Sequence, residues 1–199
     1  MVAGDPETLS ALLRDIRACR ICEDHLPLGP RPVVVADKSA KILIIGQAPG
    51  TAVHESGVPW DDPSGDRLRD WMNLGKAEFY NPARIAIMPM GFCYPGRLPK
   101  GGDAPPRPEC APQWHERLRA QLPQIELTLL VGSYAQNHYL HDRRSKNMTE
   151  TLRNWRDLGP DLLATPHPSW RSGIWLKKNP WFEAEVLPVL RERVAKLVG

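Results

Sequence analysis

The sequence predicts an α/β protein: a single three-layer domain with a central, mostly parallel four-stranded sheet flanked by helices. Four short apolar runs, too short for buried helices, alternate with stretches of helical periodicity. Strands that alternate with helices favour a parallel sheet with right-handed crossovers. A length of 199 residues is enough for one core and short for two, so we expect one domain over residues 1–199.

The expected elements follow one another regularly along the chain. An amphipathic helix over residues 7–19 carries Leu9, Leu12, Leu13 and Ile16 at helical spacing and leads directly into Cys19. Strands are expected at residues 41–46, 84–88, 126–131 and 161–165. Further helices are expected at residues 64–73, 109–122, 133–140, 148–156 and 181–197, the last interrupted by Pro188.

In open parallel sheets a ligand lies beyond the carboxyl ends of the strands. Three segments follow predicted strand ends: residues 47–65, 89–110 and 166–175. They are also the parts of the chain richest in Gly, Pro and Trp. We therefore expect the functional residues in these segments.

Composition excludes a disordered chain and a coiled coil, with 42% hydrophobic and 25% charged residues. The longest clean apolar run, residues 42–45, is far below the roughly 20 residues that cross a bilayer, and acidic residues occupy the place of a signal peptide's apolar stretch. We expect a cytoplasmic protein with no membrane partner.

Charge is distributed unevenly along the chain, with a net charge of −2 on residues 1–142 and of +5 on residues 143–199. The positive excess of residues 143–199 suits either a phosphate partner or a solvated helix surface.

The first candidate motif is Gly-Gln-Ala-Pro-Gly at residues 46–50, directly after the first strand. Its glycines let the backbone approach a ligand and present amide N–H groups to a phosphate or carbonyl. It lacks the Gly-Lys-Ser/Thr of a P-loop and the spacing of a dinucleotide-binding loop. A plain turn between a strand and a helix is the alternative.

Two ring side chains add candidate functions. Trp60 stands in a loop beside two aspartates, before a helix that we expect Ser64 to cap, and a loop aromatic suits stacking on a flat ring. Burial in the core is the alternative for Trp60.

His167 follows the fourth strand, where an imidazole could meet Gln47 across the sheet and donate a hydrogen bond to a developing oxyanion. A surface or capped histidine is the alternative.

The four cysteines form a CxxC pair, Cys19 and Cys22, and a distant pair, Cys93 and Cys110, with 16 residues between. A cytosolic location argues against disulfides, so the set suits a metal site with four thiolates. The wide second pair is more typical of a cubane iron–sulfur cluster than of a zinc ribbon. A cluster, a zinc ion and unliganded thiols all remain open at this point.

Taken together, these segments resemble the uracil-DNA glycosylase superfamily, most closely its iron–sulfur-containing family 4 branch. That branch has a Gly-Glu-Ala-Pro-Gly motif, then Gly-x-Pro-Phe-x-Gly-x-Ala-Gly, and later His-Pro-Ser. Residues 46–50, 57–65 and 167–169 match these motifs in order, and the resemblance covers residues 8–195. The chain departs from the pattern by Gln47 for Glu, Trp60 for Phe, Asp62 for Gly and Ser64 for Ala.

The resemblance implies a monofunctional DNA glycosylase of base excision repair, a hydrolase and monomer that cleaves the N-glycosidic bond of uracil or another deaminated base in DNA. His167 and Gln47 would be catalytic. The residues expected to hold the base and sugar are Gly46, Ala48, Pro49, Gly50, Trp60, Asp62 and Ser169. The residues expected to contact DNA are Trp170, Arg171, Lys177 and Lys178.

The resemblance also implies a structural 4Fe-4S cluster held by Cys19, Cys22, Cys93 and Cys110, with the N-terminal helix region, residues 7–22, as part of the domain. Zinc is the alternative metal.

Some of the differences between this sequence and the family's motifs bear on the catalytic group and on the base that is recognised. Gln47 and Ala48 cannot ionise, so a water-activating carboxylate would have to come from Glu55, Asp61 or Asp62. Pro89 stands where the family has an Asn that reads the uracil edge, and the inserted residues 94–107 are expected to reshape the pocket. The alternative function is therefore a catalytically weak DNA- or base-binding paralogue that keeps the fold and the cluster.

Overall fold

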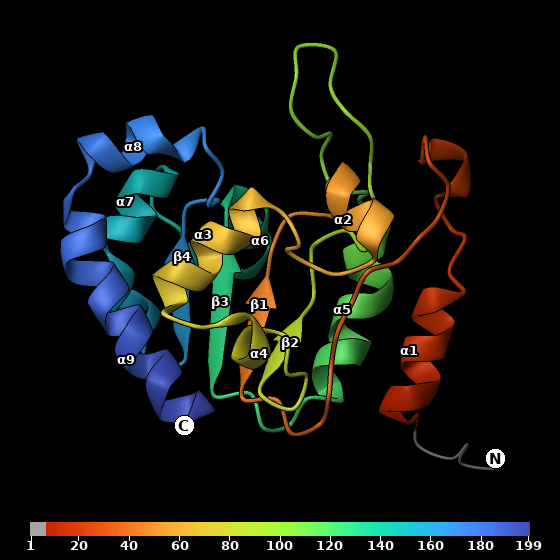
Figure 1. Ribbon diagram of the computed structural model, residues 1–199, viewed down its shortest axis with the longest axis horizontal. Coiled ribbons are helices and arrows are strands. Elements are labelled where there is room, and N and C mark those ends of the chain that lie inside the picture. Colours follow the sequence, from red (N-terminus) through yellow and green to blue (C-terminus); the bar gives the residue numbers. More distant parts are fainter. Residues whose placement is uncertain (1–6) are drawn as a thin grey trace.

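A computed structural model describes residues 7–199, and its sheet has four parallel strands in the order β2-β1-β3-β4 (Figure 1). The strands are β1 (Ile42–Ile45), β2 (Ile85–Ile87), β3 (Leu127–Val131) and β4 (Leu162–Thr165). All three strand pairings are parallel, and one isolated antiparallel bridge joins Val35 to Ile87 beside β2. The predicted fold class is confirmed, and each predicted strand is present but one or two residues shorter.

Both faces of the sheet are buried, which explains the continuous apolar runs of the strands. Along β1, Leu43 and Ile45 belong to one core cluster, whereas Ile42 and Ile44 belong to the other, because successive side chains point to opposite faces. The first cluster includes residues of α1 (Leu9–Arg17), α5 (Cys110–Ala120), α6 (Ser133–Tyr139) and α7 (Met148–Arg153), and the second includes residues of α3 (Pro63–Met72), α4 (Lys76–Phe79) and α9 (Leu187–Val198). The sheet is therefore the middle of three layers.

The helices are close to those predicted, with some differences at their ends. They are α1 (Leu9–Arg17), α2 (Thr51–Ser56), α3 (Pro63–Met72), α4 (Lys76–Phe79), α5 (Cys110–Ala120), α6 (Ser133–Tyr139), α7 (Met148–Arg153), α8 (Ser172–Lys178) and α9 (Leu187–Val198). Shorter helical turns occupy Glu23–His25, His141–Arg143, Trp155–Leu158 and Phe182–Val186. The short helices α2, α4 and α8 were not predicted.

Two predicted helix boundaries are wrong. Helix α1 ends at Arg17, so Cys19 and Cys22 lie in the turns that follow it rather than on the helix. Pro188 does not divide the last helix into two, because it lies in the first turn of α9, directly after a turn of a different helical type. The preceding turn, Phe182–Val186, is π-helical and joins α9 without a break.

The loops after β1, β2 and β4 lie at the carboxyl edge of the sheet, as expected. The segment between β2 and α5 extends beyond this edge as a long loop near α2 (Figure 1). Among residues 7–199, no helix has the length and apolar character needed to span a membrane.

Candidate active site

A cavity of about 380 Å³ opens at the carboxyl ends of the strands. Most of its lining residues come from three segments, one between β1 and the start of α3, one after β2 and one after β4. The predicted site residues that line it are Gly46, Gln47, Ala48, Pro49, Gly50, Trp60, Asp62, His167, Ser169, Trp170 and Arg171. Lys177 and Lys178, which were predicted to contact DNA, lie outside its lining.

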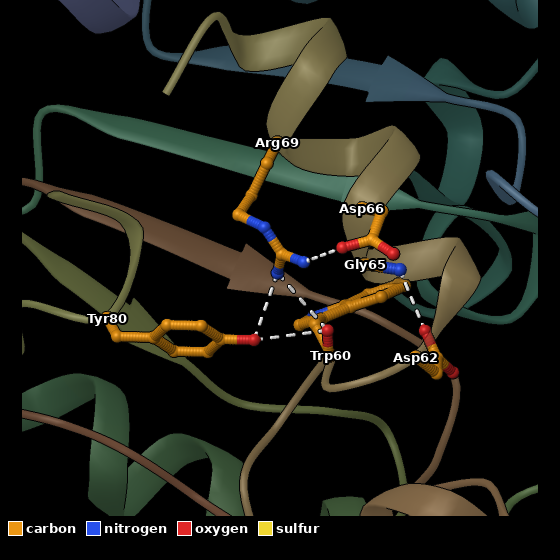
Figure 2. A network of polar contacts seen from close by, with 6 residues as sticks. All are labelled: Trp60, Asp62, Gly65, Asp66, Arg69 and Tyr80. Carbon is orange, nitrogen blue, oxygen red and sulfur yellow. Dashed lines mark hydrogen bonds and ion pairs between the residues drawn. The ribbon is translucent and has the colours of Figure 1, made fainter. Parts of the chain in front are cut away.

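Trp60 is held in an unusual backbone conformation by a polar network (Figure 2). Its φ of 58° lies in the left-handed region, which costs about 1–2 kcal/mol for a residue with a Cβ. Its carbonyl oxygen accepts hydrogen bonds from Arg69 Nη1 at 3.3 Å and from the Tyr80 hydroxyl at 3.1 Å. Arg69 is only 4% exposed and also pairs with Asp66. These bonds offset the strain and fix the turn.

Gly65 allows the Trp60 turn to close against α3. A Cβ atom at Gly65 would lie 1.7 Å from the Trp60 carbonyl oxygen, so no other residue fits there without a shift of the backbone. Asp62 is the N-cap of α3, because its Oδ1 accepts a hydrogen bond from the Gly65 N–H at 2.7 Å. The prediction of Ser64 as the cap is wrong, and Ser64 lies inside the first turn of the helix.

The rings of Trp60 and His167 are neighbours in the cavity wall. Their centroids are 5.7 Å apart and their planes are inclined by 35°. The indole packs directly on the main chain of Gly46, where a Cβ would lie 2.7 Å from the ring carbon Cζ2. The first glycine of the 46–50 motif is therefore required for this close approach.

His167 is a partly buried imidazole whose pKa is set by its surroundings. Burial lowers its pKa, while the negative charges of Asp62 and Asp103 act in the opposite direction. Because its pKa lies below the ordinary value of 6.5, the ring is neutral at neutral pH and carries one N–H donor. The Ser172 hydroxyl donates to the His167 carbonyl and helps to fix the loop.

The loop between β2 and α5 contributes Arg97, Gly102 and Asp103 to the cavity, and none of them was predicted as a site residue. The Gly-Gly-Asp sequence at 101–103 is a turn signal that could have indicated a hairpin tip. Of the three carboxylates expected to act on water, only Asp62 lines the cavity, whereas Glu55 and Asp61 do not.

The surface beside the cavity presents large apolar and cationic groups. Trp170 is 79% exposed and Ile174 is 70% exposed. The Arg171 guanidinium lies 5.5 Å from the centroid of the Trp170 ring. Arg67 Nη1 donates a hydrogen bond of 2.8 Å to the Ser169 carbonyl, which ties this loop to α3. Lys177 and Lys178 are exposed in the last turn of α8.

All four cysteines line a second, smaller cavity on the α1 side of the molecule. Cys19 and Cys22 come from the turns after α1, Cys93 follows β2, and Cys110 begins α5. Burial raises the pKa of Cys93 to about 11 and that of Cys110 to about 12. The Phe92 N–H donates a hydrogen bond to Cys110 Sγ at 3.3 Å. Within residues 7–199, no group of three or more His, Cys, Asp or Glu side chains is arranged to hold a single metal ion.

A buried histidine connects the surroundings of the two cavities. His115 Nε2 lies 3.1 Å from the carbonyl oxygen of Pro89, which lines the first cavity. Its Nδ1 lies 2.6 Å from the Tyr139 hydroxyl, and its ring stacks on Phe92, which lines the second. Burial lowers the pKa of His115 to about 4, so this ring is neutral at neutral pH.

The fold and the cavity together define an α/β protein that can hold a flat, hydrogen-bonding ligand beside an indole, a neutral imidazole and a glycine-rich loop. The sequence model of the uracil DNA glycosylase superfamily matches residues 32–191, and the chain belongs to this family. A solution NMR structure of a "putative Uracil DNA glycosylase" from Methanosarcina acetivorans is similar, with 18% identity and a TM-score of 0.47 over 80% of this chain and 94% of that chain.

Proposed function

We propose that the protein is a monofunctional DNA glycosylase that hydrolyses the N-glycosidic bond of uracil or another deaminated base. Beside the family membership, one observation carries the proposal. Gln47 and Trp60 line one cavity of about 380 Å³ at the sheet edge together with His167, which lies more than a hundred residues further along the chain. This volume falls within the roughly 300–1,000 Å³ of small-ligand pockets, as expected for a site that receives a single base.

The target base has to leave the DNA stack to reach such a cavity, as in other enzymes that act on bases. Trp60 supplies an aromatic face for the extruded base, and its turn is fixed before the base arrives by Arg69 and Tyr80. A preorganised wall avoids the cost of ordering the ring during binding. The main chain of residues 46–50 borders the same space and holds the base and sugar.

His167 acts on the leaving base in this proposal. When the N-glycosidic bond breaks, its electron pair stays on the base, and negative charge develops on a base oxygen. A neutral imidazole carries one N–H, which donates a hydrogen bond to that oxygen, and burial favours this neutral form by lowering the pKa of the ring. Water adds to the sugar carbon, so no covalent intermediate with a lysine is needed.

Trp170, Arg171, Lys177 and Lys178 serve DNA binding in this scheme. The exposed Trp170 indole is suited to fill the gap left by the extruded nucleotide, because a stacked ring replaces part of the lost stacking. Arg171 lies beside it, and the two lysines at the end of α8 are exposed cations for phosphate contacts.

We further propose that Cys19, Cys22, Cys93 and Cys110 hold a 4Fe-4S cluster. Four thiols around one cavity and an N–H donor to Cys110 Sγ fit the ligand set and the hydrogen bonding of such clusters. The cluster would supply a structural link between the turn after α1 and the start of α5, and the excision steps do not involve it.

Anaerobically purified protein tests this second proposal. We expect a brown protein with about four irons per chain, together with acid-labile sulfide. Replacing Cys110 by Ser should remove iron and colour and lower the unfolding temperature. Stoichiometric zinc without visible absorption, or a colourless protein without metal, would show that the cluster assignment is wrong.

Excision is tested with oligonucleotides that carry uracil, hypoxanthine or xanthine, single- and double-stranded, followed by cleavage of abasic sites. We expect abasic sites with at least one substrate, and a loss of roughly 100- to 1,000-fold in rate for His167→Ala with little change in binding to undamaged DNA. His141→Asn is the matched control, because His141 is exposed, lies outside the cavity, and asparagine tolerates its positive φ. Equal rates for parent and His167→Ala would contradict the assigned role.

The neutral amide at Gln47 favours a second candidate, a base-binding paralogue without excision activity. This candidate predicts that the parent forms no abasic sites on any of the substrates. It also predicts that Gln47→Glu, which restores the family's carboxylate, creates activity on uracil.

A further inference from the structure

Asp103 places a carboxylate at the cavity that none of the sequence motifs provides. It lies on the loop between β2 and α5, more than fifty residues beyond the 46–50 motif. Its Oδ2 is 3.5 Å from the position that a Cβ atom on Gly50 would occupy. The Asp103 charge also lies close enough to His167 to act on that imidazole. The carboxylate therefore lies beside the glycine-rich loop, in the lining of the same cavity as the proposed oxyanion donor.

The loop that carries Asp103 is a hydrogen-bonded hairpin. Leu98 N–H donates to the Gly102 carbonyl at 2.8 Å, and Ala104 N–H donates to the Gly96 carbonyl at 2.8 Å. Arg97 and Asp103 form an antiparallel bridge between its two arms. These bonds fix the position of the Asp103 main chain relative to the rest of the hairpin.

Contacts with two other parts of the site hold the hairpin over the cavity. A Cβ atom on Gly102 would lie 2.5 Å from Nη1 of Arg171, so the guanidinium packs closely on the hairpin tip. On the other side, Gln47 Nε2 is 3.5 Å from the Ala104 carbonyl oxygen. The hairpin therefore meets the loops after both β1 and β4, and Asp103 stands between these contacts.

The other nearby acidic and amide groups are less suited to act on water. Gln47 has no ionisable proton, and Asp62 already accepts the Gly65 N–H at 2.7 Å as the cap of α3. Asp103 is exposed at the rim of the cavity, and the structure of residues 7–199 gives its carboxylate no hydrogen bond and no ion pair, so both oxygens are free to bind water there.

We propose that Asp103 is the catalytic carboxylate of the excision reaction, which positions and activates the attacking water and stabilises the positive charge that develops on the sugar. The proposal rests on the proposed function. In this step the water oxygen bonds to the sugar C1′ while the C1′–N bond breaks, and its electron pair leaves with the base. Asp103 accepts the proton from the water and later returns it to solvent, and the base anion, held by His167, takes up a proton. The products are the abasic sugar and the free base.

The experiment compares Asp103→Asn, Asp103→Ala and the control Asp61→Asn, since Asp61 is exposed and lies outside the cavity. Single-turnover excision is measured with whichever uracil, hypoxanthine or xanthine oligonucleotide the parent cleaves, together with the Kd for the same DNA. We expect a roughly 100-fold or larger loss of rate for both Asp103 variants, the range for a removed general base, with Kd within about threefold of the parent. Formate added to Asp103→Ala should restore part of the rate.

The outcomes separate this proposal from the one on which it rests. A parent that cleaves DNA while Asp103→Asn keeps its rate within about threefold overturns the role of Asp103 alone. A parent without activity on all three bases overturns both proposals. The asparagine variant keeps the shape of the side chain and removes no hydrogen bond, and equal unfolding temperatures of parent and variant exclude misfolding as the cause of a lower rate.

Discussion

Replacing Gly65 by alanine is a direct test of the polar network around Trp60. The new Cβ would lie 1.7 Å from the Trp60 carbonyl oxygen, whereas real Cβ atoms keep at least 3.0 Å from such neighbours. The two groups must therefore separate by about 1.3 Å, the difference between these distances. A shift of that size breaks the bonds of 3.3 Å and 3.1 Å that Arg69 and Tyr80 donate to this oxygen.

The cost follows from the kind of bonds that are broken. A hydrogen bond from a charged donor contributes about 1.5–3 kcal/mol and a neutral one about 1 kcal/mol, so we expect a decrease of about 3 kcal/mol in the free energy of unfolding. For a domain of this size, this corresponds to an unfolding temperature lower by about 6–12 °C. Circular dichroism during thermal unfolding measures it.

Gly173→Ala is the matched control, because a Cβ at Gly173, in the first turn of α8, meets no atom within 4 Å. There alanine should raise the unfolding temperature slightly, since it is favoured over glycine in helices by up to about 1 kcal/mol. The same substitution thus has opposite effects at the two sites. If Gly65→Ala unfolded at the temperature of the parent or above it, the network would not hold Trp60 as described.

Three further perturbations give separate tests. Burial lowers the pKa of His115 to about 4 from 6.5, so its contribution to stability is complete above pH 6.5 and is lost as the pH falls toward 4. This loss is on the order of 3 kcal/mol in the free energy of unfolding. Urea unfolding at pH 7 and pH 4 should therefore show a smaller loss for His115→Gln than for the parent, and equal losses would contradict this prediction. Replacing Lys177 and Lys178 together by Ala should flatten the log–log salt dependence of DNA binding by roughly 0.9 for each phosphate that the lysines no longer neutralise, and an unchanged slope would place both lysines away from DNA. Arg69→Lys keeps the charge but loses the planar guanidinium that bonds to Trp60, Tyr80 and Asp66 at the same time. We expect the free energy of unfolding to fall by about 2 kcal/mol, and an unchanged value would refute the need for arginine.

The sheet and the convergence of the motifs could be predicted because both follow from local patterns. Runs such as residues 42–45 are apolar throughout since both faces of the sheet are covered. The carboxyl ends of parallel strands share one edge, so Gln47 and His167 were expected to meet, and both line the same cavity.

The details that failed depend on contacts between distant residues or on close alternatives. Asp62 and Ser64 are both good caps, and only the geometry of the turn selects Asp62. The conformation of Trp60 depends on Tyr80, twenty residues away. Asp103 reaches the cavity through a hairpin whose path over the sheet no local pattern specifies.

A ladder of main-chain hydrogen bonds continues beyond β1 and β2 and fixes the spacing of two loops that line the first cavity. The N–H groups of Met88, Met90 and Gly91 donate to the carbonyls of Ile44, Gly46 and Gln47 at 2.9–3.0 Å. Residue 89 is a proline and has no N–H, but the N–H groups that face β1 belong to residues 88 and 90, so the proline leaves these bonds to β1 and its following loop intact. These main-chain bonds join the two loops without any contribution from the side chains at 47 and 89, although the Gln47 side chain also reaches the Ala104 carbonyl oxygen of the hairpin. Under the proposed function, this pair of positions is the natural place to randomise in a selection for altered base specificity, because both residues line the cavity on a main chain that these bonds hold in place.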